Sequence, residues 1–151
     1  MPVGDDTLAY RRDLPHLTKS GKTYFVTFRT SRGVVLDPSE RVVVLASSIH
    51  DHTKLCWMHC VVVMPDHAHL IVTPFEISTL ESVLRRMKGA SGYRINKIRH
   101  RHGRIWQRES FDHIVRGDEK LSVKAEYMRA NPVRAGLVDR CEDYRWWWRA
   151  E

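Results

Sequence analysis

Alternating apolar and polar positions mark two regions of the chain as β-structure. The segment KTYFVTFRT (22–30) sends Tyr24, Val26 and Phe28 to one side of an extended chain and the residues between them to the other, which predicts a strand with one well-buried face. Farther along, KLCWMHCVVVM and HAHLIVT flank a Pro-Asp dipeptide that favours a tight turn. Residues 54–73 are therefore predicted to form a β-hairpin.

Three segments have the periodicity of helices. Residues 77–100 keep their apolar side chains on one stripe, and Ser78 followed by Glu81 resembles a capping box at the start of this long helix. Residues 37–52 show a weaker helical pattern, because a run of three valines lowers their helix propensity. Residues 117–131 have acids in the first turn and a proline immediately after them, so a third helix is predicted to end there.

The order of these elements indicates the fold. With a short strand predicted at 111–116, the elements follow one another as β-α-β-β-α-β-α. This order is typical of an α+β protein of the ferredoxin-like sandwich type, in which helices pack on a central antiparallel sheet. A chain of 151 residues fits one domain, so residues 1–151 are expected to form a single unit, with 1–20 and 141–151 as peripheral extensions.

Positive charge is concentrated in one stretch. The chain has 25 Lys and Arg residues against 18 Asp and Glu, and nine of the basic residues lie between Arg85 and Arg108 without an acid among them. A solvated helix face usually mixes both signs, so this run favours a polyanionic partner over a plain surface. The residues expected to contact nucleic acid here are Arg85, Arg86, Lys88, Arg94, Lys97, Arg99, Arg101, Arg104 and Arg108.

Tryptophans beside arginines extend this expectation to the end of the chain. Trp147 and Arg149 belong to the run RWWWR. Indole rings stack on unpaired bases while arginines bind phosphates, so both residues are candidates for DNA contact. The alternative is that the terminal tryptophans belong to the core, which is the favoured interpretation for Trp106.

Neither a membrane span nor a secretory leader is indicated. No stretch approaches the roughly 18 apolar residues of a membrane span, and residues 1–17 lack the apolar segment of a signal peptide. Three cysteines, an odd number without a CxxC pair, favour free thiols in a reducing compartment. We therefore expect a cytoplasmic protein with no membrane partner.

The segment VVVMPDHAHLIVTP places His67 and His69 in an otherwise apolar strand. Side chains two residues apart point the same way in an extended chain, so the two imidazoles can hold one divalent cation together. The alternative, two hydrogen-bonded histidines near a turn, is the commoner outcome for a random pair, but a metal satisfies both rings at once. Two other His-x-His pairs, at 50/52 and 100/102, fall at a helix end and in a loop, where this geometry is lost.

The predicted helix after the hairpin can supply further groups to such a site, because it carries Tyr93 and Asn96. A phenol beside a metal that polarises a phosphate can attack that phosphate and form a phosphotyrosine link. A tyrosine on a basic helix is more often simply exposed, and that alternative stays open. Asn96 is the candidate third metal ligand, and His113 in the predicted strand 111–116 is another.

Seven motifs, taken in order, resemble those of a known family. They are RRDLPHL with TYFVTFR, VVVMPDHAHLIV, MKGASGYRIN, GRIWQRESFDHIVR, EYMRANPVRAGLV and the terminal DYRWWW, and they cover nearly the whole chain. The set is similar to the HUH single-tyrosine transposases, in the REP-associated tyrosine transposase branch of the IS200-like enzymes. MPDHAHL and NPVRAGLV are the most specific pieces.

The resemblance implies a nuclease and strand-transfer enzyme for single-stranded DNA beside hairpins. His67 and His69 match the metal-binding HUH pair, with Ala68 in the hydrophobic position between them, and the cofactor would be Mg²⁺ or Mn²⁺. A tyrosine would attack the scissile phosphate, keep the 5′-phosphate covalently and release a 3′-hydroxyl that can later rejoin strands. The partner would be single-stranded or hairpin DNA, the location the cytoplasm in association with the nucleoid, and a homodimer stays open.

The position of the tyrosine departs from the family pattern. In the family helix that MKGASGYRIN resembles, the tyrosine corresponds to Ala90, and Tyr93 falls three residues later. We assign Tyr93 as the nucleophile and keep two alternatives. One is a catalytically impaired, domesticated protein that only binds DNA hairpins, and the other is a basic RNA-binding module.

Overall fold

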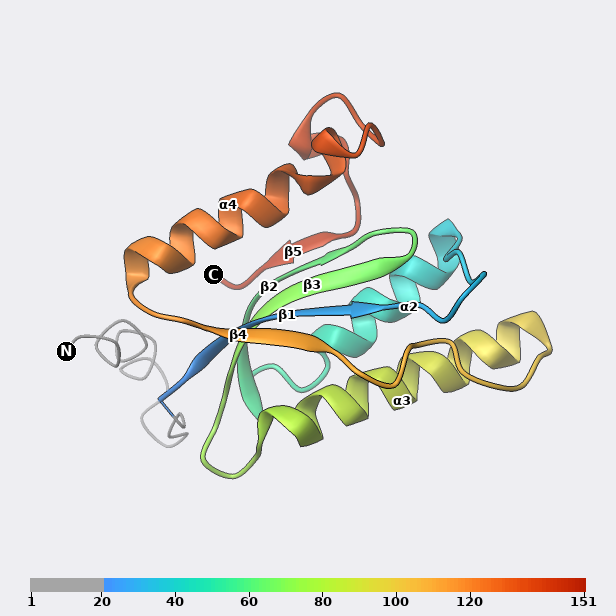
Figure 1. The fold of residues 1–151 in the computed structure, drawn as a ribbon, viewed down its shortest axis with the longest axis horizontal. Helices are drawn as coiled ribbons and strands as arrows, with labels where there is room; N and C mark the ends of the chain where they lie inside the picture. The colour runs from blue at the N-terminus through green and yellow to red at the C-terminus, as the bar shows by residue number, and fades with distance from the viewer. Residues whose placement is uncertain (1–20) are drawn as a thin grey trace.

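The computed structural model describes residues 21–151 as a five-stranded antiparallel sheet with helices on both faces (Figure 1). The strand order is β4-β1-β3-β2-β5. The predicted α+β sandwich and its order of elements are confirmed, while residues 1–20 lie outside the described part. The elements are β1 (Thr23–Arg29), α2 (Pro38–Ile49), β2 (Cys56–Val63), β3 (His67–Pro74), α3 (Leu80–Arg99), β4 (Phe111–Val115), α4 (Asp118–Arg134), a 3₁₀ turn (Cys141–Asp143) and β5 (Trp147–Arg149).

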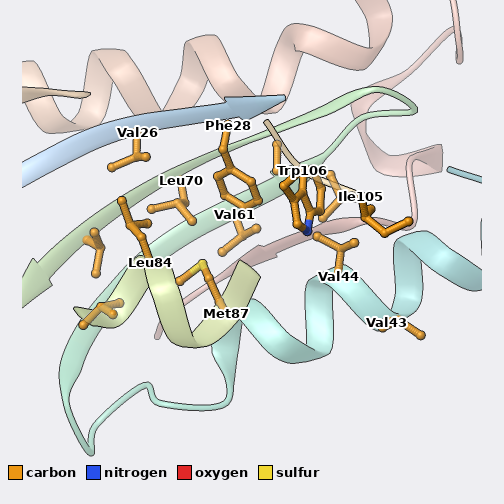
Figure 2. Close-up of a cluster of buried hydrophobic side chains, with 14 of the residues drawn as sticks. Val26, Phe28, Val43, Val44, Val61, Leu70, Leu84, Met87, Ile105 and Trp106 are labelled. Carbon is orange, nitrogen blue, oxygen red and sulfur yellow. The ribbon is translucent and has the colours of Figure 1, made fainter. Parts of the chain in front are cut away.

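Different helices cover the two faces of the sheet. Figure 1 shows α2 and α3 on one side and α4 on the other. The core beneath α2 and α3 contains Val26, Phe28 and Leu70, which Figure 2 shows in one cluster with Trp106. The core beneath α4 contains Phe25 from β1 and residues of α4 itself. The alternation of β1 and β3 therefore decides to which helix layer each strand residue points.

The start of α3 differs from the sequence prediction. Thr79 caps the helix and Ser82 completes the capping box, in place of Ser78 and Glu81. The Ser78 hydroxyl instead donates to two backbone carbonyls outside the helix, so it is unavailable as a cap.

The end of α4 also differs, because the helix continues through Pro132 to Arg134. A proline removes its own N–H from the hydrogen-bond ladder, and three residues farther along the Ala135 amide still donates to the Asn131 carbonyl at 2.9 Å. Within residues 21–151, no helix combines the length and the apolar character that crossing a membrane would need.

The C-terminal segment, expected to be a peripheral extension, contributes the short edge strand β5. It pairs with β2, so that Trp148 lies opposite Val61 and Trp147 opposite Val62. Trp147 is half-buried and packs against the core beneath α4. Its ring is thus partly used in packing, which favours the core alternative for this residue.

Two ion pairs join α2 to α3. Glu40 in the first turn of α2 is 1% exposed and accepts hydrogen bonds from Nε and Nη2 of Arg99, both at 2.7 Å. Asp51, just after α2, accepts from Nε and Nη2 of Arg86 at 2.7 and 3.1 Å. Both arginines were expected to contact nucleic acid. In the structure each guanidinium group pairs with a carboxylate of the fold, and the Arg86 side chain remains 55% exposed.

Candidate functional site

His67 and His69 lie together on the α4 face of β3. Ala68 and Leu70 belong to the opposite core, so the odd-numbered positions of this strand point toward α4. The two imidazole rings are 4.7 Å apart between centroids and nearly perpendicular, at 74°. The strand spacing thus brings the pair to one place, as predicted.

Oxygen atoms of the protein orient both rings. The Nδ1 atom of His67 lies 2.8 Å from a carboxylate oxygen of Asp66, and the Nδ1 atom of His69 lies 2.8 Å from the hydroxyl of Thr27 on β1. Phe25 stacks on the His69 ring with a centroid distance of 5.3 Å. With Nδ1 held in this way, each ring keeps Nε2 for another ligand.

The environment of His69 favours the neutral imidazole. Burial is the main cause that lowers its pKa, to about 3, and the neighbouring positive charges act in the same direction. The ring is therefore uncharged at neutral pH, which leaves a nitrogen lone pair available to a metal ion.

These features fit a divalent metal ion held by the histidine pair. Metal-binding histidines usually have their second nitrogen bonded to a carboxylate, carbonyl or other oxygen, as both rings have here. Within residues 21–151, no cluster of three His, Cys, Asp or Glu side chains has the arrangement of a metal site. Further ligands must then come from amide, water or substrate oxygens, which Mg²⁺ and Mn²⁺ favour.

The expectation that Tyr93 and Asn96 approach this pair is wrong. Both lie on α3, whose buried residues pack in the core on the other side of the sheet. Tyr93 is 64% exposed, with the Lys97 ammonium 5.4 Å from its ring centroid. The Asn96 amide donates to the Gly103 carbonyl at 2.7 Å and holds the turn after α3. The sheet itself separates both side chains from the histidines, and Ala90 on the same helix is separated likewise.

His113 does lie on the α4 face, but it is not beside the pair. It pairs in register with Phe25, and the two rings are 5.2 Å apart between centroids. Because the same Phe25 ring stacks on His69, His113 contacts the aromatic neighbour of the site rather than the space beside His67. We therefore do not assign His113 as a ligand of the same ion.

The helix on the histidine face is α4, and it carries a second tyrosine, Tyr127. Met128 and two other α4 residues form the face that packs on the sheet. Four polar or aromatic residues occupy an arc of about 80° next to Met128, at 100° per residue. These residues are Lys124, Tyr127, Asn131 and Arg134.

Contacts connect this flank of α4 to the histidine pair. The Lys124 ammonium lies 4.7 Å from the ring centroid of Phe25, which stacks on His69, and 5.8 Å from that of Tyr127. The charges of Lys124 and Arg134 both contribute to lowering the pKa of His69. The flank with Tyr127 therefore faces the same side as the histidines.

Arg134 organises the residues around Tyr127. Its guanidinium lies 4.0 Å from the ring centroid of Tyr127. Its Nη2 atom donates to the Tyr127 carbonyl at 2.8 Å and to the Asn131 amide oxygen at 3.3 Å. The motif NPVR thus arranges three side chains on one flank. The predicted helix ended at Asn131 and no site role was assigned to Tyr127, although the spacing of Tyr127 and Asn131, one helical turn apart, is visible in the sequence.

A groove of about 850 Å³ lies on the opposite face, between α3 and the segment 103–112. Four of the predicted nucleic-acid contacts line it: Arg85, Lys88, Arg104 and Arg108. The Lys88 ammonium also donates to the carbonyls of Gln107 and Arg108, at 2.9 and 3.3 Å, and so fixes the wall of the groove. The two glycines of α3 form part of its lining.

The remaining predicted contacts lie outside this groove. Arg94 and Lys97 are exposed on α3, and Arg101 donates to backbone carbonyls of its own loop. Arg149 on β5 forms an exposed ion pair with Glu126 of α4 at 3.4 Å. The basic run of the sequence is therefore divided among a groove, a helix surface and internal ion pairs.

Comparison with known proteins adds sequence relatives. The family model described as "Transposase IS200 like" matches residues 20–131, which include both histidines and Tyr127. A curated relative from Haemophilus influenzae, assigned as a REP-associated tyrosine transposase, is 28% identical over 92 residues, covering 54% of this chain and 52% of the relative. The chain thus spans about half the length of the curated relative it matches.

Solved structures share the fold. The structure of a REP-associated tyrosine transposase bound to a REP hairpin has a TM-score of 0.71 and 23% sequence identity, over 87% of this chain and 78% of that one. A structure from Deinococcus radiodurans, assigned as a transposase, has a TM-score of 0.46 and 19% identity, over 70% of this chain and 88% of that one. The first likeness confirms the sandwich fold, and the second is too distant to support an argument.

Proposed function

The chain belongs to the IS200-like transposase family, and from this premise we propose that it is a metal-dependent single-stranded DNA endonuclease and strand transferase acting beside DNA hairpins. One observation carries the proposal: an oriented histidine pair and a tyrosine-bearing helix flank share one face of the sheet. The alternative of a catalytically impaired hairpin binder arose from the position of Tyr93. Tyr127 removes that reason, since it lies on the histidine face.

Tyr127 is the proposed nucleophile. Its hydroxyl oxygen attacks the scissile phosphorus, an O–P bond forms to the tyrosine, and the bond from phosphorus to the 3′-oxygen breaks. The phenolic proton is balanced by the proton that the leaving 3′-oxygen gains. The downstream strand stays on Tyr127 through its 5′-phosphate, and attack by a 3′-hydroxyl reverses the step and joins strands.

His67 and His69 would hold the metal through Nε2, and Asn131 offers an amide oxygen from the α4 flank. When bound there, Mg²⁺ or Mn²⁺ supplies Lewis-acid chemistry that withdraws charge from the phosphate. Asp66 and Thr27 keep the two imidazoles turned with Nε2 available.

Covalent trapping tests the proposed function. A DNA hairpin with a single-stranded flank is labelled at its 3′ end, on the side downstream of cleavage, and incubated with the protein and Mn²⁺. We expect the label to migrate with the protein in a denaturing gel and EDTA to abolish this adduct. Hairpin binding without any adduct or cleaved strand, with Mg²⁺ or with Mn²⁺, would contradict the proposal and favour the non-catalytic binder. Competition with an RNA hairpin of the same sequence tests the RNA-binding alternative.

The groove along α3 is the proposed contact surface for the rest of the DNA. It gathers four basic side chains, and exposed Tyr93 at its edge offers a ring on which a base can stack. The solved relative whose fold this chain shares is bound to a REP hairpin, which supports hairpin DNA as the class of partner.

Gly89 allows the groove to be filled without removing a charge. A Cβ at this position would have no atom within 4 Å, so Gly89→Ala leaves the groove open and raises helix stability by about 1 kcal/mol. Gly89→Trp places a large ring inside the groove. We expect hairpin affinity, measured by fluorescence anisotropy at fixed salt, to fall at least about tenfold for Gly89→Trp and to stay unchanged for Gly89→Ala. Equal hairpin affinities for the two variants would show that the DNA does not bind in this groove.

A further inference from the structure

Three cationic side chains from two elements lie on the histidine face of the sheet. Arg29 lies on β1 opposite His67 and, by alternation with Phe25, points to the α4 face. Lys124 and Arg134 approach from α4.

These charges are not neutralised by the fold. Among the ion pairs formed within residues 21–151, none involves Arg29, Lys124 or Arg134. The carboxylate bonded to the pair is that of Asp66, which is 63% exposed and occupied with Nδ1 of His67. By contrast, the two arginines of α3 that pair with Asp51 and Glu40 have their charges neutralised within the fold. Like charges held close together without acids are costly unless an anion joins them.

We propose that Arg29, Lys124 and Arg134 form a phosphate-binding site around the histidine pair, which receives the DNA phosphate attacked by Tyr127. The inference rests on the proposed function and names three residues of its substrate site. Tyr127 lies between two of these cations, with Lys124 at 5.8 Å and Arg134 at 4.0 Å from its ring centroid. A phosphodiester held by all three would lie beside the tyrosine and beside Nε2 of the histidines.

The chemistry of the three groups suits a phosphodiester. Guanidinium groups donate two parallel N–H bonds that match two phosphate oxygens, and an ammonium adds a point charge. A single negative phosphate offsets part of the local charge, and in doing so favours a divalent ion at the same place. By thermodynamic linkage, metal and DNA would then strengthen each other's binding by the same factor.

Arg29 gives the sharpest test, because it lies on β1 rather than on the helix that carries Tyr127. The experiment uses the full chain with Tyr127→Phe, so that no DNA is cleaved, and measures hairpin binding by fluorescence anisotropy without divalent metal. Two DNAs are compared: one natural, and one with an uncharged methylphosphonate at the scissile position. We expect Arg29→Gln to weaken the natural DNA about tenfold and the methylphosphonate DNA less than about twofold.

Arg129→Gln is the matched control, since Arg129 lies about 200° around α4 from Tyr127 and the variant loses the same charge. We expect it to affect both DNAs equally, as a general electrostatic contribution. Thermal melting confirms that each variant folds. Equal losses for both DNAs in Arg29→Gln, or no loss in either, would overturn the phosphate site. Neither result would affect the adduct test, so the two proposals fail separately.

A second readout uses the metal alone. Mn²⁺ binding to the Tyr127→Phe protein is followed by electron paramagnetic resonance, with and without natural hairpin DNA. We expect at least about tenfold tighter Mn²⁺ binding in the presence of the natural DNA and a smaller gain with the methylphosphonate DNA. Identical Mn²⁺ affinities with and without DNA would contradict the proposal that a bound phosphate offsets the positive charge around the histidine pair.

Discussion

Tyr127→Phe is expected to abolish the covalent protein–DNA adduct, with cleavage falling by about 10³-fold or more. The change removes only the hydroxyl oxygen that attacks phosphorus. Tyr127 is 52% exposed and its hydroxyl makes no hydrogen bond within the described residues, so the folded state should lose little stability. The adduct assay with 3′-labelled hairpin DNA and Mn²⁺ measures the effect.

Tyr93→Phe is the matched control. Tyr93 is also exposed, also lies on a helix and also has a lysine near its ring, at 5.4 Å, but it stands on the opposite face of the sheet. We expect Tyr93→Phe to form the adduct at close to the wild-type rate. The reverse result, loss of the adduct in Tyr93→Phe alone, would mean that the helix layers rearrange on binding DNA and that Tyr127 is not the nucleophile.

Arg99→Met is expected to destabilise the protein by about 3 kcal/mol or more, because it leaves the Glu40 carboxylate buried without its partner. Glu40 is 1% exposed, and it would keep only the backbone N–H of Asp37 as a donor, at 3.0 Å. The methionine keeps an unbranched side chain and removes the guanidinium group. Urea unfolding at pH 7 gives the change in the free energy of unfolding.

Arg85→Met on the same helix provides the comparison. Arg85 and Glu81 are 70% and 85% exposed and 3.6 Å apart, so this ion pair should contribute at most about 0.5 kcal/mol. A similar loss of stability in both variants would show that the Glu40–Arg99 pair is worth no more than a surface contact.

The effect of Arg99→Met should also depend on pH. The hydrogen bonds from Arg99 are the main cause that lowers the pKa of Glu40 below 4.5. The pair's stabilisation is therefore fully present above pH 4.5 and is lost as the pH falls through the lower pKa of the folded state. In the variant, protonation of Glu40 relieves the uncompensated charge. The stability difference between wild type and variant should accordingly shrink as the pH falls below 4.5.

The sequence by itself determined the local geometry of the site. The two-residue period of an extended chain places His67 and His69 on one face, and the same period separates Phe25 from Val26. The order of strands and helices was sufficient for the α+β sandwich. The helical and extended periods depend on local chain geometry, so a pattern of apolar and polar positions is enough to predict each element and the face to which its side chains point.

Only the tertiary structure decided which helix faces the histidines. Both helices present a tyrosine with an asparagine about one turn later, Tyr93 with Asn96 on α3 and Tyr127 with Asn131 on α4, and the local sequence does not show which helix faces the histidines. The face on which each helix packs depends on how the chain crosses the sheet after β3 and after β4, which brings together residues distant in sequence. For the same reason, the charge run could not reveal that Arg99 is bound by an acid 59 positions away, while Arg108 remains exposed in a groove.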